Sequence, residues 1–388
     1  MVRSSVFSIL RMSSNFKKLL FVLTGFGLIY FALVSVFSTQ NSEVLTYSIS
    51  YPKFNSAIQN SKSISNVYPV DPAKLKIPVT AKGKDDDLIP LSENILKQDE
   101  IQESKGNLTC PAIEKNKQLL GHIPQAGLLI EDLTEDEIVA AHPTIRPGGH
   151  WKPSDCLPDK KVAVVIPYRD RHSHLMRLLN YLFPILQRQL LDFRFIVTEQ
   201  EGNDLFNKGR IMNAAFLLAE KLEVDCVIFH DVDMFPQDDR TPYNCPEQPR
   251  HIGAYVSNLG YQLWYNELVG GVLAMTMNDY RAINGYSNLY WAWGGEDDDM
   301  GKRILSQNMT IERPNQAYAR YSMLKHGKRK RTAPKLIYKL LESAETRWET
   351  DGVNDTSLWN VVKVDLKPLY YHLLVDVGTP PEVWRSEN

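Results

Sequence analysis

Two aspartates, Asp231 and Asp233, follow the apolar run Asp225–Phe229 and are separated by one residue, Val232. Residues two apart in an extended segment point to the same side, so both carboxylates share one side of the chain. Paired carboxylates after a buried strand suit a divalent cation and the diphosphate that this cation neutralises. A lone D-x-D triplet is more often a solvated turn, but its position after an apolar strand favours a metal site.

A second acidic group ends the segment Trp291–Asp299, which reads WAWGGEDDD. The helix dipole favours acidic residues in a helix's first turn, and this alone would explain the carboxylates. It would not explain the tryptophans and glycines that precede them. An aromatic face suits the apolar side of a sugar ring, and glycines let a ligand approach the backbone. One of the clustered carboxylates could then take a proton from a sugar hydroxyl.

Apolar runs of strand length alternate with segments of helical spacing in the middle of the chain. We expect strands at Lys161–Tyr168, Phe193–Thr198 and Asp225–Phe229, and helices at Arg171–Leu191, interrupted by Pro184, and at Gly209–Glu223. This order predicts an α/β fold whose parallel strands are buried on both faces. Such folds bind nucleotides at the carboxyl ends of their strands. The first strand is not followed by G-x-G-x-x-G, which disfavours a nicotinamide-dependent dehydrogenase.

Residues 19–37 contain no charge, and four basic residues precede them: Arg3, Arg11, Lys17 and Lys18. A helix of this length spans roughly 28 Å, about the hydrocarbon thickness of a membrane. The basic flank predicts that the tail, residues 1–18, is cytosolic and that the rest of the chain lies across the membrane. The alternative is a cleaved signal peptide, but no clear A-x-A site follows, and the apolar run exceeds the roughly 7–15 residues usual in such peptides. We therefore expect a signal anchor.

The segment 38–108 is rich in serine and has no sustained helical or strand period, so we expect a flexible stem. The core should then lie within residues 109–388. With 44 basic and 46 acidic residues the net charge is −2, which provides no field to hold a nucleic acid.

Four cysteines, none of them in a C-x-x-C pair, fit an oxidising lumen: Cys110, Cys156, Cys226 and Cys245. They allow two disulfides in three different pairings. N-glycosylation triplets, which a lumenal location would make usable, begin at Asn107, Asn308 and Asn354.

Six segments together resemble the β-1,4-galactosyltransferase family, in consistent order from about Cys110 to the end of the chain. They are VAVVIPYRDRHSHL, FNKGRIMNAAF, HDVDMFP, LVGGVLAMT, INGYSNLYWAWGGEDDD and PLYYHLLVDVGTP. The resemblance implies a type II Golgi membrane protein whose residues 109–388 form a GT-A fold, a Rossmann-like central sheet flanked by helices. It also implies an inverting enzyme that uses Mn²⁺ to move a sugar from a UDP donor to O4 of a terminal GlcNAc. The resemblance further implies the disulfide pairs Cys110–Cys156 and Cys226–Cys245.

The resemblance assigns the donor site residue by residue. Two arginines after a strand can pair with phosphate oxygens. Tyr168 stands where the family usually has Phe, Lys208 where it generally has Arg, and Arg210 where it has Lys. The implied donor contacts are Pro167, Tyr168, Arg169, Arg171, Phe206, Lys208, Val232, Asp233, Tyr265, Leu268, Gly271 and Glu296.

The resemblance also implies the metal ligands and the base. The ligands would be Asp233, Met323 and His326, which leave room for two phosphate oxygens and a water around an octahedral ion. Asp297 matches the base that deprotonates the acceptor O4 in a single in-line displacement. The implied acceptor contacts are Trp293, Asp297, Tyr338 and Leu341, and the basic run Lys325–Arg331 would begin a lid that closes after donor binding.

Leu268 departs from the family's galactosyltransferases, which carry Tyr at this position. That Tyr crowds the donor's C2 substituent, whereas Leu leaves space for an N-acetyl group. The invertebrate GalNAc-transferring branch of the family has a small aliphatic residue here. We therefore expect a β-1,4-N-acetylgalactosaminyltransferase that moves GalNAc from UDP-GalNAc to GlcNAc-terminated glycolipid or glycoprotein glycans.

Three alternatives remain to that interpretation of Leu268. The first is a neutral substitution in the core. The second is a β-1,4-galactosyltransferase that uses UDP-galactose and tolerates Leu268. The third is a non-catalytic glycan-binding scaffold in the lumen, which the joint retention of Asp297, Asp233, Met323 and His326 argues against. A membrane partner protein could bind the anchor, and the sequence does not identify one.

Overall fold

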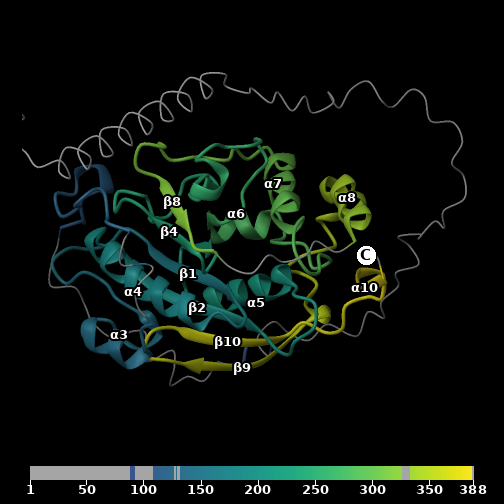
Figure 1. The fold of residues 1–388 in the computed structure, drawn as a ribbon, viewed down its shortest axis with the longest axis horizontal. Coiled ribbons are helices and arrows are strands. Elements are labelled where there is room, and N and C mark those ends of the chain that lie inside the picture. The colour runs from purple at the N-terminus through teal and green to yellow at the C-terminus, as the bar shows by residue number, and fades with distance from the viewer. Residues whose placement is uncertain (1–87, 92–107, 126–127, 129–131, 326–332, 387–388) are drawn as a thin grey trace, which may run out of the picture. The chain divides into compact units, whose positions relative to one another are not determined.

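The computed structural model describes residues 88–91, 108–125, 128, 132–325 and 333–386 (Figure 1). They all belong to one unit, Ile77–Asn388. The expected cytosolic tail, the signal anchor at 19–37 and most of the stem lie outside these residues, as do Asn107 and His326. Within the described part of the chain, no helix is both long enough and apolar enough to cross a membrane.

A seven-stranded mixed sheet forms the centre of the domain, in the order β5-β7-β3-β1-β2-β10-β9. β1 is parallel to β2 and β3, β10 is parallel to β2, and antiparallel pairs join β7 to β3 and to β5, and β9 to β10. The strands are β1 (Lys161–Tyr168), β2 (Asp192–Gln200), β3 (Cys226–His230), β5 (Arg250–His251), β7 (Val272–Thr276), β9 (Asn360–Leu366) and β10 (Tyr371–Asp376).

The alternation of side chains along β1 explains why this strand reads as a continuous apolar run. Val162, Val164 and Ile166 pack with α4 (His172–Arg188), whereas Ala163 and Val165 pack with α5 (Lys208–Lys221) on the opposite face. Each face of the sheet therefore has a helical layer (Figure 1). The βαβαβ order expected from the sequence is confirmed as β1-α4-β2-α5-β3.

The expected interruption of the first helix at Pro184 is wrong. α4 continues through this proline to Arg188. Phe183, Ile185 and Leu186 around the proline are fully buried in the core on this face of the sheet. Their packing outweighs the roughly 3 kcal/mol that a proline costs inside a helix.

A second, three-stranded sheet has the order β4-β8-β6. In Figure 1, β4, β8, α6 and α7 lie on one side of the central strands β1 and β2, and β9 and β10 lie on the other. The remaining elements are β4 (Met234–Pro236), β6 (Tyr255–Val256), β8 (Arg320–Met323), α3 (Glu135–Ala141), α6 (Met277–Ala282), α7 (Glu296–Ser306), α8 (Pro334–Glu342), α9 (Ala344–Arg347) and α10 (Val383–Ser386).

Two disulfides pair the four cysteines as the resemblance implies. Cys110 is bonded to Cys156, and Cys226 is bonded to Cys245. The second bond ties the first residue of β3 to the segment that precedes β5. β3 is the strand that leads into Asp231 and Asp233.

Candidate active site

One cleft opens at the carboxyl ends of β1 and β3, beside the first turn of α7. β1 leads into Arg169 and Arg171, and β3 leads into Asp231 and Asp233. The fold therefore gathers at one edge of the sheet the two acidic groups that the sequence separates. The cleft is lined by Pro167, Arg169, Arg171, Phe206, Lys208, Asp231, Val232, Asp233, Ala292, Trp293, Glu296, Asp297 and Met323.

Lys208 lies at the centre of this group of carboxylates. Its Nζ is 3.1 Å from Asp231 Oδ1, 3.3 Å from both oxygens of Asp297, and 3.6 Å from Glu296 Oε1. Lys208 is the first residue of α5, which Asn207 caps by accepting a hydrogen bond from Arg210 N. Burial opposes the charge of Lys208, but Asp231 and Asp297 outweigh burial and raise its pKa well above the usual value. The lysine is therefore a fixed positive charge inside the cleft.

Asp297 has the properties of a general base. Burial raises the pKa of its carboxyl to about 8; Lys208 opposes this rise, and the charge of Glu296 adds to it. A base whose pKa lies near neutral pH both accepts a proton readily and is largely available to do so. A Cβ atom added to Gly270 would lie 2.9 Å from Asp297 Oδ2, so the absence of a side chain there makes room for the carboxylate.

Two arginines lie at the β1 end of the cleft. Arg171 Nη1 donates to Asp233 Oδ2 at 3.0 Å. The guanidinium of Arg169 stacks 4.9 Å from the ring centre of Phe206, and its Nη1 donates to Asp204 O at 2.6 Å. A planar cation held on an aromatic ring is pre-positioned for an anionic ligand. This end of the cleft suits a diphosphate.

Asp233 and Met323 are the two implied metal ligands within the described residues, and they lie together. The β4–β8 pairing places Met323 beside Met234, and Leu324 N donates to Asp233 O at 2.9 Å. The Asp233 side chain is only 4% exposed, and Met323 Sδ accepts a hydrogen bond from Asn258 Nδ2 at 2.9 Å. A carboxylate and a thioether that face one cleft fit a cation whose other ligands come from a diphosphate. Among the described residues, no cluster of three His, Cys, Asp or Glu side chains could hold a metal.

Several residues that the resemblance assigns do not line the cleft. Tyr168 lies beside it, where burial and the charge of Glu199 raise the pKa of its hydroxyl. Leu268 is partly buried, and its carbonyl accepts a hydrogen bond from Arg313 Nη2 at 3.2 Å. The other residues outside the lining are Tyr265, Gly271, Tyr338 and Leu341.

The surroundings of these four residues differ. Tyr265 is 42% exposed and donates to Asp298 Oδ1 at 2.6 Å. Gly271, with φ of 91°, lines a small second cavity behind Lys208. Tyr338 on α8 is 62% exposed, and Leu341 follows it on the same helix. None of these four residues belongs to the lining of the cleft.

Arg210 supports the backbone next to the cleft and does not enter it. Its guanidinium stacks 4.8 Å from the ring centre of Trp291 and donates to Asn288 O at 2.9 Å and to Val377 O at 2.6 Å. Arg210 therefore fixes the segment that leads to Trp293. The Arg that stands at this position, where the family has Lys, therefore stacks on Trp291 and donates to backbone carbonyls outside the cleft.

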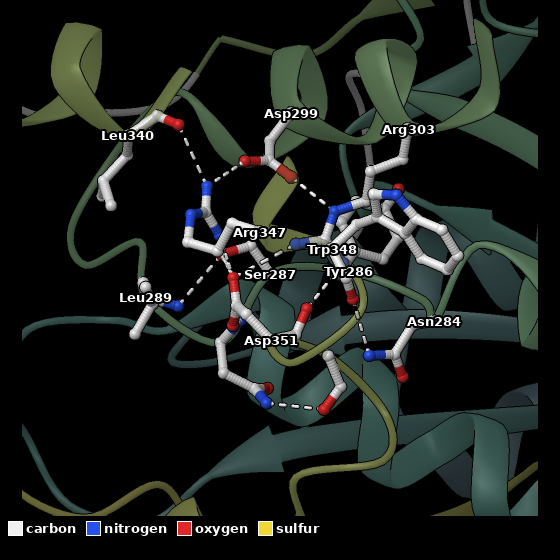
Figure 2. A network of polar contacts seen from close by, with 12 residues as sticks. Asn284, Tyr286, Ser287, Leu289, Asp299, Arg303, Leu340, Arg347, Trp348 and Asp351 are labelled. Carbon is white, nitrogen blue, oxygen red and sulfur yellow. Dashed lines mark hydrogen bonds and ion pairs between the residues drawn. The ribbon is translucent and has the colours of Figure 1, made fainter. Parts of the chain in front are cut away.

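A buried polar network behind α7 was missed by sequence reasoning. Figure 2 shows Asp299 and Arg303 of α7 with Arg347 and Asp351, which follow much later in the chain. Their side chains are at most 14% exposed. The spacing of Asp299 and Arg303 on one helix was the only local signal, and it did not point to the distant partners.

The described glycosylation triplets differ in the freedom of their asparagines. Asn308 is exposed in the turn after α7, with φ of 57°. The side-chain amide of Asn354 donates to Glu349 O at 2.9 Å and accepts from Asn284 Nδ2 at 2.7 Å. In the folded domain, Asn308 therefore presents the more accessible side chain.

Comparisons with known proteins agree with this geometry. Residues 110–246 match the N-terminal region of glycosyl transferase group 7, and residues 250–327 match a family model described as the N-terminal domain of galactosyltransferase. The chain is 38% identical to mouse β-1,4-galactosyltransferase 1 over 287 residues, covering 72% of this chain and 70% of the relative. It is 41% identical to human β-1,4-galactosyltransferase 5 over 275 residues, covering 70% and 69%.

Solved structures share the fold. A mutant of Drosophila β-1,4-galactosyltransferase 7, in complex with manganese, UDP-Gal and xylobiose, superposes with a TM-score of 0.50 at 25% identity. The match covers 58% of this chain and 97% of that protein. The catalytic domain of the same Drosophila enzyme with xylobiose gives a TM-score of 0.52 at 24% identity. The mixed sheet described above is therefore a GT-A-like α/β fold.

Proposed function

Because this chain belongs to the β-1,4-galactosyltransferase family, we propose that it transfers a sugar from a UDP donor to O4 of a terminal GlcNAc, with inversion at the anomeric carbon. One observation carries this proposal. A single cleft has an arginine-rich end suited to a diphosphate and, at its other end, a carboxyl with a raised pKa beside an exposed tryptophan. The first end suits the donor, and the second suits a sugar acceptor.

The proposed chemistry is one displacement at the donor C1. Asp297 accepts the proton of the acceptor O4 hydroxyl as this oxygen bonds to C1, and the bond from C1 to the diphosphate oxygen breaks. UDP leaves with the electron pair. Arg169 and Arg171 orient the diphosphate, and Trp293, which is 50% exposed, offers an aromatic face to the acceptor ring.

Manganese is the proposed cofactor, since it is bound in the complex of the Drosophila relative. Asp233 and Met323 would hold it here, with His326 as a third ligand that lies outside the described residues. When bound, the ion acts as a Lewis acid that offsets the charge on the departing UDP.

UDP-galactose is the donor that the relatives favour. The curated relatives are named as galactosyltransferases, and the Drosophila complex contains UDP-Gal. The sequence-based expectation placed UDP-GalNAc first because of Leu268, and this residue does not line the described cleft. UDP-GalNAc therefore becomes the second candidate, supported by the absence of an aromatic ring at position 268.

A donor comparison tests both the activity and the sugar. The purified lumenal part of the chain would receive Mn²⁺, a GlcNAc-terminated acceptor and one UDP-sugar at a time. We expect the higher kcat/KM with UDP-galactose, and Leu268→Tyr should then change the ratio of the two donors little. A preference for UDP-GalNAc that Leu268→Tyr reverses would favour the second candidate. Leu120→Tyr, at a position 76% exposed, is the matched control.

Asp297→Asn tests whether the protein is an enzyme at all. We expect this variant to lose transfer while still binding UDP. Unchanged turnover would reject Asp297 as the base. No transfer by the native chain from either donor would favour the glycan-binding scaffold.

The proposed location is the Golgi membrane, with residues 19–37 as a single type II anchor, 38–108 as a stem and 109–388 as the lumenal catalytic domain. The support is the uncharged span and its basic flank. Protease treatment of sealed microsomes should leave the domain intact until detergent is added.

A further inference from the structure

Asp299 and Arg303 of α7 form a closed network of ion pairs with Arg347 and Asp351 (Figure 2). Asp299 Oδ1 accepts from Arg303 Nε at 2.6 Å, and Asp299 Oδ2 accepts from Arg347 Nη2 at 2.5 Å. Asp351 Oδ2 accepts from Arg303 Nη2 at 3.1 Å and also from Arg347 Nη1. Two carboxylates and two guanidinium groups balance in charge, as buried ions must.

Within this network, Arg303 and Arg347 have different surroundings. Arg303 is fully buried and also donates to the backbone at Gly285 O and Asp351 O. Arg347 lies nearer the surface, with a side chain 14% exposed, and joins three separate segments. Its Nη2 reaches Leu340 O at the end of α8 at 3.1 Å, and its Nη1 reaches Ser287 Oγ at 2.9 Å.

α8 packs on the residue that starts the acidic helix. A Cβ atom added to Gly295 would lie 2.8 Å from Ile337 Cγ2 of α8 and 2.7 Å from the ring of Tyr290. Tyr290 in turn donates to Asp299 Oδ2 at 2.9 Å. The position of α8 is therefore coupled through Arg347 and Asp299 to the segment between Trp293 and Asp297.

We propose that Arg347 is a positioning residue for the acceptor half of the active site, which consists of Trp293 and Asp297. It holds α8 and the Trp293–Gly295 segment in one arrangement relative to Asp297, although it touches neither substrate. Asp297 and Asp299 are about 200° apart around α7, so one faces the cleft while the other is held from behind. This inference rests on the proposed function, because it assumes that the acceptor sugar binds between Trp293 and Asp297.

Loss of Arg347 should leave the donor half intact. Arg169, Arg171, Asp233 and Lys208 belong to other elements, and Asp299 retains Arg303 as a partner. The acceptor half should lose its alignment, because Arg347 is the member of this network that contacts both Leu340 of α8 and Asp299 of α7. The acceptor KM should therefore change while UDP affinity does not. A general loss of stability would instead weaken both.

Arg347 is the last residue of α9 and pairs with Asp299 of α7. The test compares Arg347→Gln and Arg347→Lys with a second ion pair between α7 and α9 as the control. Lys302 and Glu345 also join α7 to α9, at 3.8 Å, but are 36% and 62% exposed. Glu345→Gln should therefore change little. For Arg347→Gln we expect the acceptor KM to rise about 10- to 100-fold, with UDP affinity in Mn²⁺ unchanged within about twofold. Lys keeps the charge but loses the forked contacts, so Arg347→Lys should give an intermediate acceptor KM.

An unchanged acceptor KM in Arg347→Gln would overturn the proposal, and so would a parallel loss of UDP affinity and acceptor affinity at a temperature where the variant is folded. If Arg347→Gln does not fold, Arg347→Lys decides between the same outcomes. Binding of a GlcNAc oligosaccharide to the UDP–Mn²⁺ complex, measured by NMR, needs no turnover. A native chain that binds GlcNAc but transfers nothing would therefore refute the proposed function without refuting the role of Arg347.

Discussion

Replacing Lys208 with Gln removes the positive charge that lies among three carboxylates in the cleft. The structure predicts a change in the pH dependence of turnover rather than a uniform loss. Asp297 has a pKa of about 8, which burial raises and Lys208 holds down. Without Lys208, the carboxyl should bind its proton more tightly and be available as a base only at higher pH.

The size of this shift follows from the geometry. Two unit charges 3.3 Å apart attract by about 5 kcal/mol at an effective dielectric constant of about 20. This is an upper bound, because the charge of Lys208 is shared with Asp231 and Glu296 and its side chain is 15% exposed. A nearby opposite charge typically shifts a carboxyl pKa by about 1–3 units. At pH 8, the ionised fraction of Asp297 should therefore fall by about 5- to 500-fold.

The assay is the pH profile of kcat/KM for the UDP-sugar, which reports the ionisation of the free enzyme. We expect activity of the native chain to rise with pH through about 8, because deprotonated Asp297 is the active form. Lys208→Gln should move this rise to higher pH, and activity should recover in alkaline buffer. Lys208→Arg keeps the charge and should leave the profile close to native.

Two outcomes would refute this reasoning. A loss of the same factor at every pH would mean that Lys208 acts through substrate contact or folding rather than through Asp297. A profile of Lys208→Gln that rises at the native pH would mean that Lys208 does not control the pKa of Asp297. Binding of UDP to the variant, measured by calorimetry, separates the first outcome from simple misfolding.

Two further predictions concern the metal site and the disulfides. Asp233→Asn should raise the Mn²⁺ concentration needed for half-maximal activity by about tenfold or more, because it removes a carboxylate from the implied ligands. The measurement is a Mn²⁺ titration of activity, and a half-maximal concentration equal to that of the native chain would contradict the prediction. Cys226 and Cys245 are 19 residues apart, and replacing both with Ala should lower the free energy of unfolding by about 3 kcal/mol. Cys110 and Cys156 are 46 residues apart, so replacing that pair should lower it by about 4 kcal/mol. Urea denaturation measures both changes. The reverse order would argue against chain entropy as the cause.

The fold was predictable where local pattern and burial agree. β1 reads as an uninterrupted apolar run because both faces of the sheet are covered, and the alternation with helices gave the parallel order of β1, β2 and β3. Among the antiparallel additions, β5 has only two residues and β9 is partly exposed, whereas β7 pairs with β3 across a long intervening stretch of chain. Pro184 shows the limit of local rules, because tertiary packing overrode its effect.

The site was predictable in part for a related reason. Asp231 and Asp233 were found because they follow a buried strand, and the acidic group that contains Asp297 because it opens a helix. The choice of Asp297 within that group came from the family resemblance. That Lys208 would meet Asp231, Glu296 and Asp297 depends on how α5 and α7 pack, which no local pattern encodes. Arg347 lies 48 residues from Asp299 in a segment with no motif, so its role could be seen only in three dimensions.

The acidic run Glu296–Asp299 illustrates why residue type alone does not assign a role. The helix dipole favours acidic residues throughout this first turn, so the dipole does not tell the four carboxylates apart. In the structure Glu296 and Asp297 face Lys208, Asp298 accepts from the Tyr265 hydroxyl, and Asp299 is buried between two arginines. A helix turns by about 100° per residue, so four adjacent carboxylates necessarily meet different neighbours. The cleft side of this first turn is therefore suited to chemistry because its opposite side is fixed by ion pairs.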